Sequence, residues 1–303
     1  MPELPNTPGR PATRFRREIK YLVSESSARA IAGYLQRYVE PDRYTWGHPD
    51  GAYPVASLYL DSEDLRLFRA SQDGLKNRFK LRIRSYIDDP EYPRFIEIKR
   101  RVNTWMVKSH VRVMVADIGP LLSGRDGRFE GGDEGAETLN QFMYYSRRFF
   151  VRPMLQVRYL RQAFESSDAN FVRVTFDRDL CIKAAQNLEL KLMAPGWQRV
   201  PLGEVILEFK ISDHYPRWLQ DLVRRFELRQ QSVCKYGIGL QQAQRLGFCR
   251  PRLGQEFYNG SIVVAAGGAF GRRKNRFGGE RAPSVVAGVC TGPGVRVGVL
   301  RDA

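Results

Sequence analysis

The sequence predicts an α+β protein in which about eight antiparallel strands form a barrel, or tunnel, with helices flanking it. Charged and apolar residues alternate within most of the strand-like segments, which is typical of strands with one polar and one packed face. Only a few segments have helical periodicity. Short segments rich in β-branched and aromatic residues recur between turn signals at residues 16–22, 54–60, 77–87, 93–101, 105–114, 153–163, 171–178 and 204–212.

Two longer helices are predicted from capping and periodicity. The first begins after Ser24, an N-cap residue, and places Ile31 and Leu35 on one face. The second carries Trp218 and Leu222 on one apolar stripe. The helical segments that we expect are residues 24–39, 62–71, a mixed region around 137–149, and 216–228.

Composition divides the 303 residues into three parts. Residues 1–13 are polar and rich in proline, which predicts a flexible lead. Residues 14–250 carry the strand and helix patterns, and the overall hydrophobic content of 43% is sufficient for a core. Residues 251–303 are rich in glycine and arginine without periodicity, so we expect a disordered tail.

The net charge of +16 predicts a polyanionic partner: a nucleic acid, an anionic membrane or a phosphate compound. The four cysteines form no CxxC pair and there are three histidines, which argues against a zinc cluster. The N-terminus lacks the apolar stretch of a signal peptide, and no apolar run approaches the roughly 20 residues of a membrane span. We therefore expect a cytoplasmic protein.

The polar faces of the predicted strands are dominated by cations. Lys80, Arg82 and Arg84 share one face of their strand, whereas Leu81 and Ile83 share the other. The cations on such faces are Lys20, Lys80, Arg82, Arg84, Lys99, Lys108, Arg112, Arg161, Arg173 and Lys210. The carboxylates are Glu18, Glu97, Asp177 and Glu208.

For any single strand, the simplest interpretation is a sheet with one face in solvent. A solvated face usually mixes both charges with Ser, Thr and Gln, whereas here at least six strands carry charge on one face and cations outnumber carboxylates. Closing the strands with the charged face inward would create a cationic lumen that a chain of phosphates could neutralise. Magnesium takes one or two carboxylates together with substrate phosphates, which makes Glu208, Glu97 and Glu18 the candidate metal ligands.

The order of these segments resembles the catalytic domain of the vacuolar transporter chaperone (VTC) family, one of the triphosphate tunnel metalloenzymes. The resemblance covers residues 14–245 and rests on eight motifs in order. They are Arg17-Glu18-Ile19-Lys20-Tyr21, Ser57-Leu58-Tyr59-Leu60-Asp61, Lys80-Leu81-Arg82-Ile83-Arg84-Ser85-Tyr86, Glu97-Ile98-Lys99-Arg100, Tyr159-Leu160-Arg161-Gln162-Ala163-Phe164, Arg173-Val174-Thr175-Phe176-Asp177, Leu207-Glu208-Phe209-Lys210 and Cys234-Lys235-Tyr236. Cys234 stands where the family more often has serine.

The resemblance implies an eight-stranded tunnel that makes inorganic polyphosphate from ATP with Mn²⁺ or Mg²⁺, and it implies Glu208 as the metal ligand. By motif position it also implies a role in phosphate binding for Lys235, which follows the last strand. We expect catalytic positions at Lys20, Arg82, Arg84, Arg161 and Arg173. We expect substrate binding at Lys80, Lys99, Lys108, Arg112, Lys210 and Lys235.

Three functions remain open at this point. The first is a phosphotransferase, in which the end of a polyphosphate chain attacks the γ-phosphorus of ATP; this needs no general base, in agreement with the few histidines. The second is a metal-dependent tri- or polyphosphate hydrolase with water as the acceptor. The third is a non-catalytic module that binds polyphosphate, or RNA, through the same cations. We expect ATP and polyphosphate as partners and no specific nucleic acid.

Overall fold

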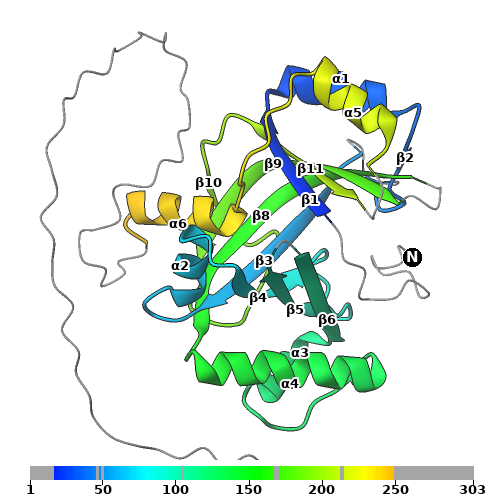
Figure 1. Ribbon diagram of the computed structural model, residues 1–303. Helices are drawn as coiled ribbons and strands as arrows, with labels where there is room; N and C mark the ends of the chain where they lie inside the picture. The colour runs from blue at the N-terminus through cyan, green and yellow to red at the C-terminus, as the bar shows by residue number, and fades with distance from the viewer. Residues whose placement is uncertain are drawn as a thin grey trace, which may run out of the picture. The chain divides into compact units, whose positions relative to one another are not determined.

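The computed structural model describes residues 17–45, 48, 51–103, 105–166, 171–211 and 215–248. The predicted N-terminal lead (1–13) and tail (251–303) lie outside the described residues. Within the described part, the protein has a mixed α+β fold with one large antiparallel sheet and six helices (Figure 1). The predicted α+β class is therefore confirmed.

The eight predicted strands are the eight long strands of the sheet. They are β1 (Arg17–Val23), β3 (Tyr53–Asp61), β4 (Asn77–Ser85), β5 (Arg94–Val102), β6 (Trp105–Val113), β8 (Arg152–Glu165), β9 (Val172–Ala184) and β11 (Val205–Ile211). Three two-residue strands bring the total in the described residues to eleven: β2 (Glu40–Pro41), β7 (Phe129–Glu130) and β10 (Gln198–Arg199).

The sheet is open, so the prediction of a closed eight-stranded barrel was wrong. Its strand order is β1-β11-β9-β8-β3-β4-β5-β6-β7, with β2 paired to β8 and β10 to β9. In the described residues β1 pairs only with β11, and part of the outer edge of β6 is taken by β7. A side-chain contact links the edge strand β1 to β5, since Glu18 and Lys99 form an ion pair of 2.7 Å.

The apolar faces of the strands form the core together with the helices. Leu81 and Ile83 of β4 are fully buried, as their alternation with cations predicts. Helices α3 (Val115–Leu122) and α4 (Gly132–Arg148) cover this part of the sheet, with Phe142 fully buried against it. Helix α4 begins at residue 132 and so extends further toward the N-terminus than predicted.

Helices α1 (Glu25–Leu35) and α5 (Arg217–Arg225) pack together over β1, β9 and β11 (Figure 1). Ser24 caps α1 as predicted, since its hydroxyl accepts a hydrogen bond of 3.1 Å from the Ser27 amide. Helix α1 ends at Leu35, four residues before the predicted end. None of the helices in the described residues has the length and hydrophobicity that a membrane crossing requires.

The third pair consists of α2 (Arg66–Gln72) and α6 (Lys235–Arg245), which pack on β3, β8 and β9. Buried Asp61, at the end of β3, accepts 2.9 Å hydrogen bonds from the amides of Leu67 and Phe68 in α2. It also accepts one of 3.1 Å from the Tyr236 hydroxyl in α6. Asp61 thus ties both helices to the sheet, and α6 is a helix that the sequence did not predict.

Close packing of α6 makes Gly239 sensitive to substitution. A Cβ atom at this position would lie 2.9 Å from Leu155 Cδ2 and 3.0 Å from Ile182 Cγ2, and both side chains are fully buried. We expect Gly239→Ala to lower the free energy of unfolding by about 1–3 kcal/mol in urea melts, the usual cost of overpacking a core. Gly33→Ala, at an exposed position of α1 with open space around it, should raise it by about 1 kcal/mol. An unchanged midpoint for Gly239→Ala would show that α6 is not held this closely.

Candidate functional site

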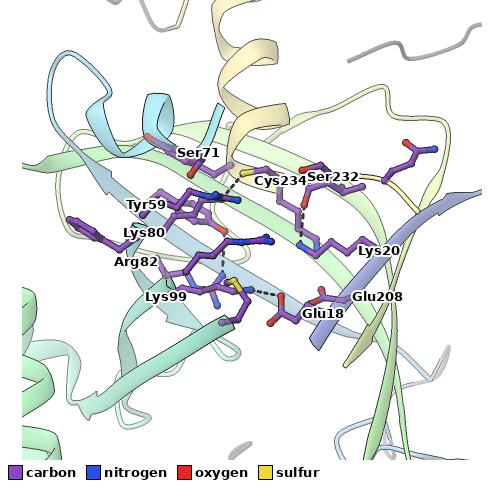
Figure 2. A pocket seen from close by; sticks show the side chains of 18 of the residues that line it. Glu18, Lys20, Tyr59, Ser71, Lys80, Arg82, Lys99, Glu208, Ser232 and Cys234 are labelled. Carbon is purple, nitrogen blue, oxygen red and sulfur yellow. Dashed lines mark hydrogen bonds and ion pairs between the residues drawn. The ribbon is translucent and has the colours of Figure 1, made fainter. Parts of the chain in front are cut away.

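A cavity of about 840 Å³ lies on the charged face of the sheet (Figure 2). Its walls come from β1, β3, β4, β5, β8 and β11, and the segment 230–236 forms a further side. Ten of the residues predicted to act in the site line this cavity. They are Glu18, Lys20, Lys80, Arg82, Arg84, Lys99, Arg161, Glu208, Lys210 and Lys235.

Strand register explains why these side chains meet. Antiparallel pairing places Arg82 opposite Glu97 and Lys80 opposite Lys99, on the face away from the core. On the neighbouring strands β1 and β11, Lys20 lies opposite Glu208. Because side chains alternate along each strand, the apolar positions between these residues all point into the core.

Glu97 is surrounded by three cations. It lies 2.5 Å from Arg82 Nε, 2.5 Å from Lys108 Nζ and 3.9 Å from Arg84 Nε, and its side chain is 1% exposed. Burial raises the pKa of Glu97, but Arg82, Arg84 and Lys108 outweigh it and hold that pKa well below its usual range. Glu97 therefore holds the side chains of these three cations in place, and its predicted role as a metal ligand does not fit this geometry.

A second network joins the sheet to α6. Asp177 of β9 accepts two hydrogen bonds from Arg161, of 2.7 and 2.8 Å, and forms a 2.6 Å ion pair with Lys235. Burial raises the pKa of Asp177, yet Arg161 and Lys235 lower it to about 2. Lys235 is the first residue of α6, so this helix brings the cation to the cavity, as the motif predicted.

Glu18 and Glu208 are the two carboxylates that line the cavity. Figure 2 shows them beside each other on β1 and β11, with Lys99 pointing toward Glu18. The nearest cation to Glu208 is Lys210, at 3.9 Å, so the Glu208 oxygens have no direct ion-pair contact as short as that of Glu18. Burial raises the pKa of Glu208, but Lys210, Lys20 and Lys99 hold it well below its usual range. Both carboxylates are therefore ionised at neutral pH, since the pKa of Glu18 is also lowered, chiefly by Lys99 against burial.

The lysines around these carboxylates differ in the direction of their pKa shifts. Burial lowers the pKa of Lys210 to about 7, although Glu208 opposes this effect. Burial also acts on Lys20, but Glu208 and Glu18 outweigh it and raise the pKa of that lysine. Lys20 Nζ donates a 3.0 Å hydrogen bond to the carbonyl of Val233, which fixes the segment before α6.

Arg112 and Arg173, both predicted to contact substrate, do not line the cavity. Arg112 forms a half-exposed ion pair of 2.9 Å with Glu130 of β7. Arg173 forms ion pairs with Asp42 and Glu165, and it donates a hydrogen bond of 3.1 Å to the Tyr53 hydroxyl. Lys108 reaches the site only through Glu97.

Cys234 is the site residue whose contacts the sequence did not predict. Its Sγ accepts hydrogen bonds from Lys80 Nζ at 2.9 Å and from the Gly237 amide at 3.3 Å, so it caps α6 in place of a hydroxyl (Figure 2). Burial raises the pKa of the Cys234 thiol, but Lys80 outweighs it and lowers that pKa to about 7. The signals in the sequence were its position beside Lys235 in the last motif and the serine that the family more often has there.

Titration of Cys234 should therefore depend on Lys80. With Cys181, Cys249 and Cys290 replaced by serine, we expect alkylation of Cys234 to be half-maximal near pH 7, and Lys80→Met to move this midpoint up toward the ordinary value of 9.0. Lys76→Met, which removes another cavity-lining cation, should leave it in place. Because the folded pKa is the lower one, the thiolate stabilises the fold fully above pH 9 and loses this effect as the pH falls through about 7. A midpoint near 9 in the parent protein would contradict the ion pair.

The fold and the site together define an α+β protein with a cation-lined cavity on one face of an antiparallel sheet. A sequence model of the VTC domain matches residues 15–244. This match spans more than half of the chain, so the protein belongs to the VTC domain family and the resemblance noted above is confirmed. No curated protein matches the chain.

Solved structures with a similar arrangement have low sequence identity. A candidate adenylate cyclase from Bacillus halodurans has a TM-score of 0.40 and 13% identity, over 76% of this chain and 97% of that chain. A candidate adenylyl cyclase from Hippeastrum, described as having a dominant triphosphatase activity, has a TM-score of 0.42 and 10% identity. That match covers 79% of this chain and 98% of the other.

Proposed function

We propose that this protein is a metal-dependent polyphosphate polymerase that transfers the γ-phosphate of ATP to a growing inorganic polyphosphate chain. One observation carries the proposal: eleven lysine and arginine side chains line the cavity against two carboxylates. Like charges this close repel one another unless a polyanion lies between them. A chain of phosphates has the required charge density, and membership in the VTC domain family supports the same substrate class.

In the proposed reaction, the cations position the two phosphate groups that react. Arg82, Arg84 and Arg161 bind the β- and γ-phosphates of ATP, because guanidinium groups contact phosphate oxygens in pairs. A terminal oxygen of the polyphosphate chain attacks the γ-phosphorus. The bond from this phosphorus to the β–γ bridging oxygen breaks, and ADP leaves with the electron pair. Phosphate oxygens are already anionic at neutral pH, so no general base is required.

The proposed metal site consists of Glu208 and Glu18. Among the described residues, no three of the His, Cys, Asp and Glu side chains come together as a complete protein site. Mg²⁺ and Mn²⁺ at phosphoryl-transfer sites need only one or two carboxylates, because the substrate phosphates supply further oxygen ligands. Two ionised carboxylates side by side fit that requirement. When bound, the ion would neutralise charge on the phosphate oxygens during transfer.

Hydrolysis of tri- or polyphosphate is the alternative activity, since the same cavity could direct water at the γ-phosphorus. A non-catalytic binding module is disfavoured, because Glu18 and Glu208 reduce the positive charge that a pure anion site would use. The aromatic side chains at the cavity include Tyr59, which is buried and stacks on Tyr236 at 4.6 Å. Base stacking, the usual basis of RNA binding, is therefore not available at Tyr59.

The test is to incubate the purified chain with γ-labelled ATP and Mn²⁺, with and without EDTA, and to follow polymer and free phosphate separately. We expect labelled polymer that EDTA abolishes. Free phosphate without polymer would replace the proposal with the hydrolase. Tight binding of polyphosphate with no turnover in the presence of Mn²⁺ or Mg²⁺ would leave the non-catalytic binding module as the function.

A further inference from the structure

Thr175, in the middle of β9, carries a buried hydroxyl group without a hydrogen-bond partner. Its side chain is fully buried, and among the described residues its Oγ1 atom neither donates nor accepts a hydrogen bond. Thr175 does not line the cavity, so its hydroxyl is closed off from the water there. Most buried polar groups are hydrogen-bonded, because an unsatisfied hydroxyl inside a protein lowers stability. An exception of this kind in a native fold requires an explanation.

Strand pairing places this hydroxyl group beside Glu208. Thr175 of β9 lies directly opposite Glu208 of β11, and Glu208 in turn lies opposite Lys20 of β1. Directly opposed residues of an antiparallel pair project from the same face of the sheet, with Cβ atoms about 4.5–5.5 Å apart. Over this separation, rotation of the two side chains is sufficient to bring the threonine hydroxyl within hydrogen-bond distance of the carboxylate.

The carboxylate of Glu208 also lacks a hydrogen bond. Among the described residues it accepts none, and its ion pair with Lys210 is 3.9 Å long. Glu18, in contrast, accepts a hydrogen bond of 2.7 Å from Lys99. Buried ionised carboxylates are normally held by hydrogen bonds as well as by opposite charge. A donor and an acceptor that both lack hydrogen bonds therefore lie side by side on β9 and β11.

The other neighbours of Thr175 already have partners or need none. Asp177 and Arg173, the adjacent residues on the same face of β9, are held in the ion pairs described above. On β8 the residue opposite Thr175 is Ala163, which has no polar side-chain atom. Glu208 is therefore the neighbour that a hydrogen bond from Thr175 would serve.

We propose that Thr175 is a positioning residue of the metal site, and that its hydroxyl donates a hydrogen bond to the Glu208 carboxylate when a divalent cation is bound there. This inference rests on the metal site given under the proposed function. Carboxylates that bind metals are usually hydrogen-bonded by outer-sphere partners, which fix their orientation. In the metal-free protein the hydroxyl stays unpaired. Thr175 therefore lowers the stability of the metal-free fold and raises its affinity for the metal.

The experiment measures Mn²⁺ affinity and metal-free stability on the full-length chain. Thr175→Val removes the hydroxyl and keeps the shape of the side chain, whereas Thr175→Ser keeps the hydroxyl. The control is Thr138→Val, which removes the hydroxyl of another buried threonine, on α4 and outside the cavity. Mn²⁺ affinity is read from the paramagnetic signal of the free ion, and stability from urea melts in EDTA.

The two measurements should change in opposite directions. We expect Thr175→Val to bind Mn²⁺ about 10–100-fold more weakly, as for the loss of an outer-sphere partner. In EDTA the same variant should unfold at a higher urea concentration than the parent protein, because a buried hydroxyl without a partner has been removed. Thr175→Ser and Thr138→Val should both keep the Mn²⁺ affinity of the parent protein.

Two results would overturn the inference. Unchanged Mn²⁺ affinity in Thr175→Val would mean that the hydroxyl does not act on Glu208. Weaker Mn²⁺ binding together with a lower urea midpoint in EDTA would mean that the hydroxyl already supports the metal-free fold. If Thr175→Val does not fold, Thr175→Ala is compared with Thr175→Ser, since these two differ by the hydroxyl alone. Equal Mn²⁺ affinities in that pair would also contradict the role of Thr175.

The polymerase proposal is decided separately, by the assay with γ-labelled ATP. Weaker Mn²⁺ binding with a raised urea midpoint in Thr175→Val would uphold the inference even if the parent protein made no polymer. Polymer formation by the parent protein, with unchanged Mn²⁺ affinity in Thr175→Val, would uphold the proposed function and overturn the inference. A parent protein that bound no Mn²⁺ would overturn the metal site and this inference together.

Discussion

Glu208→Gln is expected to reduce metal-dependent polymer formation by about 10²–10³-fold, the scale of losing one preorganised electrostatic group. Gln keeps the size of the side chain but removes the negative charge that a divalent cation requires. The affinity for Mn²⁺ should fall by more than the roughly 10–100-fold that is typical of losing an outer-sphere partner. Mn²⁺ binding is read by the paramagnetic signal of the free ion, independently of turnover.

The same substitution should also change stability, with a defined sign. The buried carboxylate stabilises Lys20, Lys210 and Lys99, so its loss leaves like charges together. Removing one partner of a buried ion pair costs about 3–5 kcal/mol, and we expect the lower end here because Lys210, with a pKa of about 7, can release its proton. Tripolyphosphate should restore part of this stability in urea melts, since it supplies negative charge to the same lysines.

Glu130→Gln is the matched control for this prediction. Glu130 is a carboxylate of the same sheet that pairs with Arg112 and does not line the cavity. We expect it to retain Mn²⁺ affinity and activity. If Glu208→Gln bound Mn²⁺ as tightly as the parent protein, Glu208 would be a structural counter-charge for the lysines and the metal site would have to lie elsewhere.

Alternation along strands predicted most of the site because it depends on local geometry alone. Once β4 is a strand, Lys80, Arg82 and Arg84 must share a face opposite Leu81 and Ile83. The same argument gives the face of Arg112 and Arg173 but not their depth along it. Both have nearby carboxylates that come from distant parts of the chain, Glu130 for Arg112 and Asp42 for Arg173. Such pairings depend on tertiary structure, so the sequence placed these two arginines in the cavity wrongly.

Helix α6 and the open edge of the sheet show two further limits. Gly237 and Gly239 weaken the helical pattern of residues 235–245, yet the structure needs them because Phe68 and Leu155 approach so closely. The helical propensity of residues 235–245 therefore predicted no helix, although the packing of the structure contains one there. Closure of the barrel was predicted from the number of long strands, which was right, but strand number does not determine whether the two edges pair. In this sheet the Glu18–Lys99 ion pair links edge strand β1 to β5 through side chains, without backbone pairing between these two strands.

Arg82→Ala is expected to lower kcat and kcat/KM together, by about 10²–10³-fold, as for an interaction that is made in the transition state. Arg82 lies between Glu97 and Tyr59, with Nε 2.5 Å from the carboxylate and a terminal nitrogen 3.4 Å from the hydroxyl. These contacts fix the guanidinium before substrate arrives. Arg82→Lys should recover only part of the rate, because an ammonium group is a point charge and cannot contact two phosphate oxygens in a fixed plane. Arg112→Ala, on the same face but outside the cavity, should keep the parent rate.

A variant of Glu97 separates the direct effect of Arg82 on activity from the effect of Glu97 in positioning the cations around it. After Arg82→Ala, Glu97 still has Arg84 and Lys108 as partners, so the fold should lose little stability. Glu97→Gln, in contrast, releases three cations at once and should lower both stability and activity. If Arg82 acts on the phosphates directly and Glu97 acts by orienting it, the double variant Arg82→Ala/Glu97→Gln should be about as slow as Arg82→Ala alone. The two losses of activity should then not add. A purely additive pair of losses would instead mean that Arg82 and Glu97 act independently, and the role of Glu97 in orienting Arg82 would be abandoned.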